Sequence, residues 1–152
     1  MKTFVFAVAV ALVGTVAQAQ DFYAGAVYDL VLPHSGEDAS PVDLLGGVRF
    51  GDGQVSYGAE ADLGLSGDAE YTPMRLRGIV RNDMGRYALL GSIGYTSYDL
   101  DAGGTTDGYN FSLGGDIEIT PMIDLRLEVM RDMMPDYSTN VTNVRIGSVY
   151  NF

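Results

Sequence analysis

Apolar and polar residues alternate with a period of two along most of the chain beyond residue 20. The alternation is clearest across residues 55–65, where Val, Tyr, Ala and Leu at odd positions oppose Ser, Gly, Glu and Asp at even positions. This period is typical of a β-strand with one apolar face, because successive side chains point to opposite faces. We therefore predict eight strands, at about residues 22–32, 42–50, 55–65, 74–81, 87–97, 109–119, 123–131 and 143–152.

The two faces of these segments differ in charge. Even-numbered positions are the apolar ones in the first, second, fourth and eighth segments, and odd-numbered positions are apolar in the other four. The opposite face carries charges in nearly every segment, at Asp29, Asp43, Arg49, Glu60, Asp62, Arg75, Arg77, Arg81, Asp116, Glu118, Arg126, Glu128 and Arg145. Aromatic residues of the apolar face gather near segment ends, at Phe22, Phe50, Tyr57, Tyr87, Tyr95, Tyr109, Tyr150 and Phe152. Charges on one face and two aromatic girdles on the other favour a membrane barrel over a soluble β-sandwich.

The connections between the segments alternate in length. Residues 51–53, 82–85 and 120–122 form tight turns, whereas residues 33–41, 66–73, 99–108 and 132–142 are longer and polar. Short turns at one end and longer loops at the other are typical of outer-membrane barrels, with the short turns in the periplasm. The predicted fold class is all-β, an eight-stranded antiparallel up-and-down transmembrane β-barrel over residues 20–152 whose side chains fill its interior.

Residues 1–19 have the pattern of a secretory signal peptide. Lys2 provides a positive start, an apolar run follows from Phe4 to Ala17, and Ala17-Gln18-Ala19 supplies small residues at the cleavage site. The run is too short for a helix that spans a bilayer, which needs about 20 apolar residues. We predict cleavage after Ala19, which leaves one domain in the bacterial outer membrane.

Charge and cysteine content exclude several classes of function. Loss of residues 1–19 removes the one lysine, so eight arginines face twenty Asp and Glu residues and the net charge is −12. Such a chain repels nucleic acid, because it cannot replace the counterions of phosphate. The absence of cysteine excludes disulfides, thiol catalysis and zinc sites built on cysteine.

The inward charges predict an interior network of ion pairs. We expect Glu60, Asp62, Glu118 and Glu128 to accept hydrogen bonds from Arg75, Arg77, Arg126 and Arg145, with Asp116 in the same network. Buried charges persist when they are paired and hydrogen-bonded, so pairing predicts a closed lumen. A narrow conducting pore lined by the same residues is the alternative.

The whole chain beyond the signal peptide resembles the small eight-stranded outer-membrane proteins: the transmembrane domain of OmpA, the OmpX and Ail group, and opacity-type porin-family proteins. The resemblance depends on Ala17-Gln18-Ala19, the alternating segments and the C-terminal Val149-Tyr150-Asn151-Phe152. It implies a non-enzymatic structural or surface-interaction role, contact with outer-membrane lipid and lipopolysaccharide, and handling by periplasmic chaperones. It also implies that Tyr150 and Phe152 are read by the barrel-assembly machinery, and that the four longer loops contact a surface ligand.

The alternative of a lipid A-modifying barrel enzyme depends on His34, the one histidine, with Ser66 and Asp68 in the next long loop. Ser35 follows His34 directly, so the His-x-Ser-Asn pattern of the deacylases is absent, as is the amphipathic N-terminal helix of the palmitoyltransferases. We therefore predict no catalytic residue.

Residues 99–110 partly resemble a calcium loop, with Asp99, Asp101, Gly103, Gly104 and Asp107. The fifth position is Gly103, and Asn110 stands where a bidentate Glu belongs. The methionines at 130, 133 and 134 favour packing at the rim over a metal site. We predict no metal and no cofactor.

Overall fold

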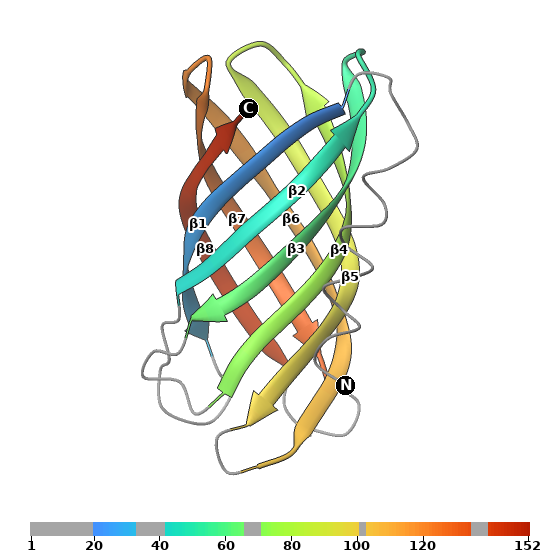
Figure 1. The fold of residues 1–152 in the computed structure, drawn as a ribbon, viewed down its shortest axis with the longest axis vertical. Helices are drawn as coiled ribbons and strands as arrows, with labels where there is room; N and C mark the ends of the chain where they lie inside the picture. Colours follow the sequence, from blue (N-terminus) through green and yellow to red (C-terminus); the bar gives the residue numbers. More distant parts are fainter. Residues whose placement is uncertain (1–19, 33–41, 66–70, 101–102, 135–139) are drawn as a thin grey trace.

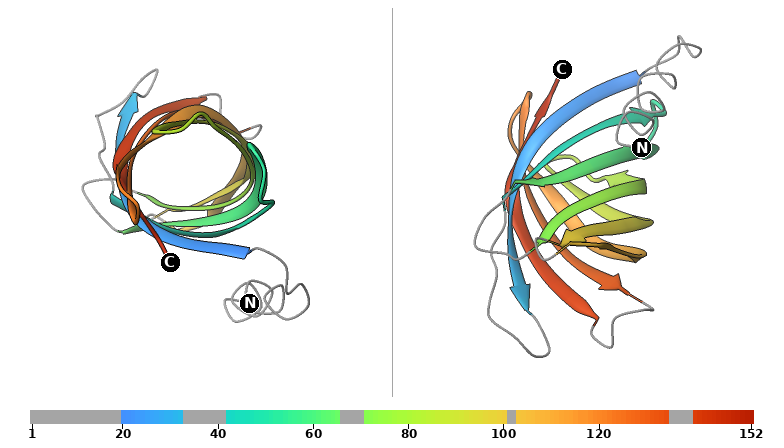
Figure 2. Two further views of the ribbon diagram at one scale, coloured as in Figure 1. Left: turned by 90° about the horizontal axis from the view of Figure 1, so that it is seen from above. Right: turned by 60° about the horizontal axis from the view of Figure 1, so that its bottom comes forward.

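The structure is a computed structural model that describes residues 20–32, 42–65, 71–100, 103–134 and 140–152. These residues form a closed barrel of eight antiparallel strands in sequence order, in which β8 also pairs with β1 (Figures 1 and 2). The strands are β1 (Gln20–Leu32), β2 (Val42–Phe50), β3 (Val55–Leu65), β4 (Tyr71–Asp83), β5 (Tyr87–Leu100), β6 (Thr105–Thr120), β7 (Ile123–Met133) and β8 (Val141–Asn151). The predicted fold class is confirmed.

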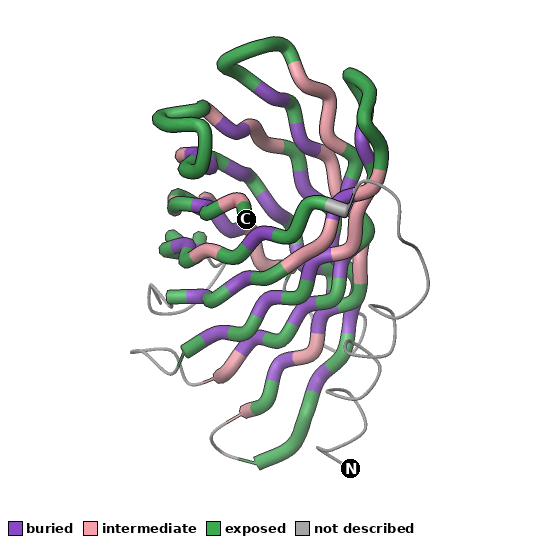
Figure 3. Tube along the Cα trace, turned by 45° about the horizontal axis from the view of Figure 1, so that its top comes forward, coloured by how far each residue is buried: buried purple, intermediate pink, exposed green. Residues whose placement is uncertain are grey.

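Burial alternates along every strand, as Figure 3 shows for the whole barrel. In β3, Glu60 and Asp62 are buried inside, whereas Ala61 and Leu63 are exposed outside. Exposed positions are even-numbered in β1, β2, β4 and β8 and odd-numbered in the other four strands, apart from partly buried positions and from three exposed residues near the short-turn end, Asp21, Glu118 and Thr120. The predicted faces are therefore confirmed in all eight strands.

Three tight turns at residues 51–54, 84–86 and 121–122 lie at one end of the barrel, together with the start of β1 and the end of β8 (Figure 1). We call this the short-turn end, and the other the opposite end. Among the described residues, no helix is long and apolar enough to cross a membrane.

At the opposite end the strands are longer than predicted. β4 begins at Tyr71, so residues 71–73 belong to the sheet, and β7 continues to Met133. β5 and β6 extend over most of the predicted loop 99–108, where Leu100 N donates to Gly104 O at 3.0 Å in a tight turn. Gly103 and Gly104 have φ angles of 94° and 108°, a conformation that favours glycine. The loop prediction was wrong there because Thr105 and Asp107 are polar on the outward face, which hides the alternation.

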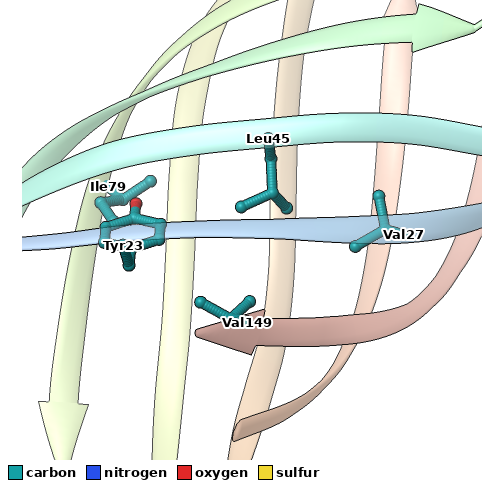
Figure 4. Packing of buried hydrophobic residues seen from close by; sticks show 5 residues of the cluster. All are labelled: Tyr23, Val27, Leu45, Ile79 and Val149. Carbon is teal, nitrogen blue, oxygen red and sulfur yellow. The ribbon is translucent and has the colours of Figure 1, made fainter. Parts of the chain in front are cut away.

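Large inward side chains lie beside glycines of the neighbouring strand. Tyr23 in β1 is paired with Gly47 in β2, and a Cβ on that glycine would collide with the tyrosine ring. Arg77 is likewise paired with Gly94. Tyr23 also belongs to a small buried apolar cluster, formed by Tyr23, Val27, Leu45, Ile79 and Val149 (Figure 4). Large residues therefore fit the narrow interior because their neighbours have no side chain.

Candidate functional site

The candidate site is the charged interior of the barrel. Eight carboxylates are buried there: Asp29, Asp43, Glu60, Asp62, Asp116, Asp124, Glu128 and Asp132. Five arginines are buried with them, at positions 49, 75, 77, 126 and 145, and the half-buried Arg81 lies at the short-turn end. The alternation of the strands places every one of these side chains inside, because each lies on the polar face of its strand.

Nearest the short-turn end, Arg81 lies 3.0 Å from Asp83 and 3.6 Å from Asp124. Arg49 donates a hydrogen bond to the side chain of Asn151, the last residue of β8. These groups retain some exposure, since the side chain of Arg81 is 16% accessible. They form the outer layer of the network at this end.

The next layer is centred on Arg126. Its Nε donates to Asp116 at 2.9 Å and its Nη1 donates to Glu60 at 2.6 Å. Tyr23 Oη also donates to Glu60, at 2.8 Å, while the guanidinium carbons of Arg49 and Arg126 lie 4.8 Å and 5.6 Å from the tyrosine ring. Tyr23 therefore joins this layer both by a hydrogen bond and by cation–π contact.

Arg77 connects this layer to the middle of the lumen. Its two terminal nitrogens donate to Glu60 and to Glu128, the latter at 2.6 Å. Asp62 lies 3.5 Å from the same guanidinium, and Ser112 donates to Glu128 at 2.5 Å. Glu60 comes from β3 and Glu128 from β7, so Arg77 of β4 links distant strands.

Arg145 lies among four carboxylates. Its nitrogens are 2.8 Å from Asp29, 3.3 Å from Asp43, 3.0 Å from Asp62 and 3.1 Å from Glu128. The side chains of all five residues are at most 3% accessible. These four carboxylates come from β1, β2, β3 and β7, so Arg145 connects four other strands to β8.

The layer towards the opposite end is centred on Asp132. This carboxylate accepts hydrogen bonds from Thr96 at 2.9 Å, Tyr98 at 2.6 Å, Asn143 at 2.8 Å and Arg75 at 3.1 Å. Arg75 also contacts two more carboxylates, at 2.5 Å in Asp43 and 3.4 Å in Asp29. The network thus continues through the lumen from one end to the other.

The structure brings together eight of the nine residues predicted for the interior network: Glu60, Asp62, Arg75, Arg77, Asp116, Arg126, Glu128 and Arg145. Glu118 is the exception, and the expectation that it accepts from an arginine was wrong. It is exposed beyond the pairing of Tyr87 with Ile117, where the β6–β7 ladder shifts register after it. Glu118 therefore lies at the rim, outside the lumen.

The predicted network lacked four acids that the structure places in it: Asp29, Asp43, Asp124 and Asp132. The first three lie on polar faces that the alternation had identified. Asp132 was assigned to a loop because the predicted strand ended at residue 131. Extending the period of two by one residue would have placed Asp132 inside.

The remaining sequence candidates lie apart from this network. Tyr150 and Phe152 are exposed on the outside, with ring centroids 5.1 Å apart, and Phe152 N donates to Phe22 O at 3.0 Å. His34, Ser66, Asp68 and Asp101 lie outside the described residues. The other positions of the predicted calcium-like segment separate: Asp99 and Asp107 are exposed and Asn110 is buried inside.

The three methionines divide between the two faces near the end of β7. Met130 and Met134 are buried, and Met133 is exposed. Within the described part of the chain, no group of three or more His, Asp or Glu side chains is arranged to hold a metal ion. The chemistry that the interior supports is electrostatic, a lumen filled by arginine–carboxylate contacts across the barrel.

A scan of protein-family models gives no match to this sequence, and a search of curated proteins gives none. Solved structures do match. Ail, the attachment invasion locus protein of Yersinia pestis, is 11% identical with a TM-score of 0.63, over 88% of this chain and 97% of that one. Neisserial surface protein A is 12% identical with a TM-score of 0.58, over 91% and 100% of the two chains.

The N-terminal β-barrel domain of Pseudomonas aeruginosa OprF is 10% identical with a TM-score of 0.58, over 86% of this chain and 97% of that one. At these identities the likeness shows the fold, which is that of small eight-stranded outer-membrane barrel proteins.

Proposed function

We propose that this chain, which has the fold of small eight-stranded outer-membrane barrel proteins, is a non-enzymatic integral protein of the bacterial outer membrane. Its role would be structural, or would depend on surface contacts made at the opposite end. One observation carries the proposal: the barrel is apolar outside and charged inside. Water-soluble proteins bury their apolar residues and expose their charges, and here the order is reversed.

The outward face supports a lipid environment. Ile93 and Leu113 are 71% and 72% exposed near the middle of β5 and β6. Outward tyrosines lie towards the strand ends, with Tyr87 at the short-turn end and Tyr95 and Tyr109 towards the other. An apolar band between aromatic girdles fits a bilayer, where the amphipathic rings lie at the headgroups.

The lengths of the connections and the pattern of residues 1–19 support one orientation in the membrane. We propose that residues 1–19 are a signal peptide cleaved after Ala19, and that the short-turn end faces the periplasm. Chaperones and the barrel-assembly machinery would act on that route, with Tyr150 and Phe152 as the assembly signal. Lipid and lipopolysaccharide would surround the folded barrel.

Membrane fractionation tests the location. The chain should be recovered in outer-membrane fractions as a band that migrates faster in unheated samples, because a folded barrel resists detergent until it is heated. An epitope inserted within residues 66–70 should be accessible on intact cells, whereas one inserted at 51–53 should be accessible only after lysis. A soluble periplasmic protein, or the reverse accessibility, would contradict the proposal.

The acidic opposite end restricts the surface partner. Residues 33–41, 66–70, 101–104 and 134–140 together contain six Asp and Glu residues and no Lys or Arg. Ail has been solved in complex with the heparin analogue sucrose octasulfate, but this end should repel a polysulfate. We propose a cationic partner, or an anionic partner that binds through divalent cations. Cells that display the barrel should bind polylysine and not heparin, and salt should weaken that binding.

A narrow channel is the second candidate, favoured by the ionisable residues that line the lumen over its length. The ion pairs of Arg77 and Arg145 across the lumen oppose it, because they occupy the space that ions would need. Planar-bilayer recordings distinguish the two. We expect no conductance above background from the wild type, and steady ohmic conductance would establish the channel instead.

A further inference from the structure

The charges inside the barrel do not balance. Eight buried carboxylates face six inward arginines, which leaves an excess of two negative charges if all of these groups are ionised. The two other arginines lie elsewhere, Arg86 in the turn at 84–86 and Arg131 on the outward face of β7. The connections at the opposite end contain no lysine or arginine that could supply the missing charge.

The excess lies in one part of the lumen. Glu60, Asp116 and Asp124 lie towards the short-turn end with three arginines, at positions 49, 81 and 126, so the charges there are matched. Five further carboxylates surround only three arginines, at positions 75, 77 and 145; they are Asp29, Asp43, Asp62, Glu128 and Asp132. Uncompensated buried charge is costly, so an added positive charge would stabilise this region.

Two of these five carboxylates are short of hydrogen bonds. Both oxygens of Asp29, Glu128 and Asp132 accept at least one hydrogen bond. In contrast, Asp43 Oδ1 and both oxygens of Asp62 accept none from the described residues, although these side chains have no accessible surface. The charge excess and the missing donors therefore coincide.

The same two residues are neighbours. Asp43 is opposite Gly64 in the β2–β3 ladder and Asp62 is opposite Leu45, so the two inward side chains are diagonal neighbours. Arg145 lies between them, with Nη2 3.3 Å from Asp43 and Nη1 3.0 Å from Asp62. The charged groups that face them are Asp29 of β1, Arg75 and Arg77 of β4, Glu128 of β7 and Arg145 of β8.

We propose that Asp43 and Asp62 hold a proton between them at neutral pH, so that the lumen contains a proton-binding site. The barrel takes this proton from solvent as it folds. A shared proton halves the charge excess and gives one orphaned carboxyl a donor. Two carboxylates held close together away from water resist double ionisation, because burial and the repulsion between their negative charges both disfavour the second charge.

Infrared spectroscopy of the folded barrel in detergent micelles tests the proposal. The wild type should show the C=O stretch of a protonated, solvent-shielded carboxyl at neutral pH. Asp43→Asn or Asp62→Asn should abolish that band, because the proton is no longer needed, and should leave the denaturation midpoint unchanged. Asp132→Asn is the matched control, since its carboxylate accepts four hydrogen bonds; it should keep the band and raise the unfolding equilibrium constant about tenfold or more.

Three outcomes would overturn the proposal. The first is the absence of the band in the wild type. The second is a loss of stability in Asp43→Asn and Asp62→Asn as large as in Asp132→Asn, or in Glu128→Gln should Asp132→Asn fail to fold. The third is a wild-type midpoint that rises with added sodium or calcium while that of Asp62→Asn does not, which would assign the site to a metal cation.

Discussion

Gly47 shows how closely single residues are fitted inside this barrel. Its Cα lies opposite Tyr23, whose hydroxyl reaches Glu60 and whose ring contacts two arginines. A side chain at position 47 would displace that ring and therefore disturb the charged layer behind it. The glycine is thus part of the network although it has no functional group of its own.

We expect Gly47→Ala to lower the free energy of unfolding by about 1–3 kcal/mol, as overpacking does in other tightly packed interiors. Gly46→Ala is the matched control, because a Cβ there faces outward and meets nothing closer than the Tyr23 carbonyl oxygen at 3.9 Å. Urea unfolding of both variants in micelles measures the difference. Equal stabilities would show that Tyr23 can move without cost.

Arg145 is the residue whose substitution should destabilise the folded barrel most. Arg145→Gln leaves four carboxylates around a neutral side chain. Removal of one partner from a buried ion pair costs about 3–5 kcal/mol, whereas Arg86→Gln in an exposed turn should change stability by less than about 0.5 kcal/mol. Chemical denaturation again provides the measurement, and similar midpoints for the two variants would be inconsistent with a network centred on Arg145.

At the scale of the strand, the alternation of side chains separates the polar lumen from the apolar outer surface. In β6 the inward positions 110, 112 and 116 are polar and buried, and the outward positions between them include Phe111 and Leu113. A register error of one residue would exchange the two sets completely. Alternation therefore determines the environment of each side chain before any neighbouring strand is considered.

The stability cost of a charge on the outward face should depend on its position along the strand. Leu113→Arg places a charge in the middle of the outward face of β6, and should cost about 2–4 kcal/mol if that face contacts lipid. Thr105→Arg is on the same face of the same strand but at its end, where the cost should be about 0–1 kcal/mol. Refolding into lipid vesicles followed by urea titration gives both values, and equal costs would argue against a bilayer around the barrel.

At the scale of the whole molecule, closure between β1 and β8 makes the end of the chain part of the wall. Phe152 N donates to Phe22 O, which joins the C-terminus to the start of the first strand. The Phe152 ring remains 78% exposed and touches Tyr150 alone among the aromatic pairs of the described residues. Its position therefore suits recognition by another protein better than it suits internal packing.

Deletion of Phe152 should accordingly impair insertion in cells more than it lowers the stability of the folded barrel. The amount of heat-modifiable protein in outer-membrane fractions should fall, while refolding of the same variant in detergent should remain close to that of wild type. Substitution of Phe50, another aromatic residue at the short-turn end, controls for loss of a girdle residue. Normal assembly of the deleted chain would remove the role assigned to this residue.

Strand positions and the inward or outward direction of each side chain could be predicted from the sequence by itself. The reason is physical: in a strand that separates an apolar from a polar environment, each residue's identity reports its own side. The prediction failed where that contrast fades, at the strand ends, where Thr105 and Asp107 are polar on the outer face and Asp132 follows an outward arginine.

The pairing of charges was decided by the tertiary structure. Asp29 and Arg145 are 116 residues apart and meet because β1 closes on β8. Arg75 was expected to pair with an acid among Glu60, Asp62, Glu118 and Glu128, which was wrong. The structure brings it instead to Asp29, Asp43 and Asp132, and Asp132 lies on β7. Glu118 shows the converse, since the correct period places it on the inward face and the register of the barrel leaves it outside the lumen. Period sets the face of a residue, but closure and stagger of the strands set its height and its partners.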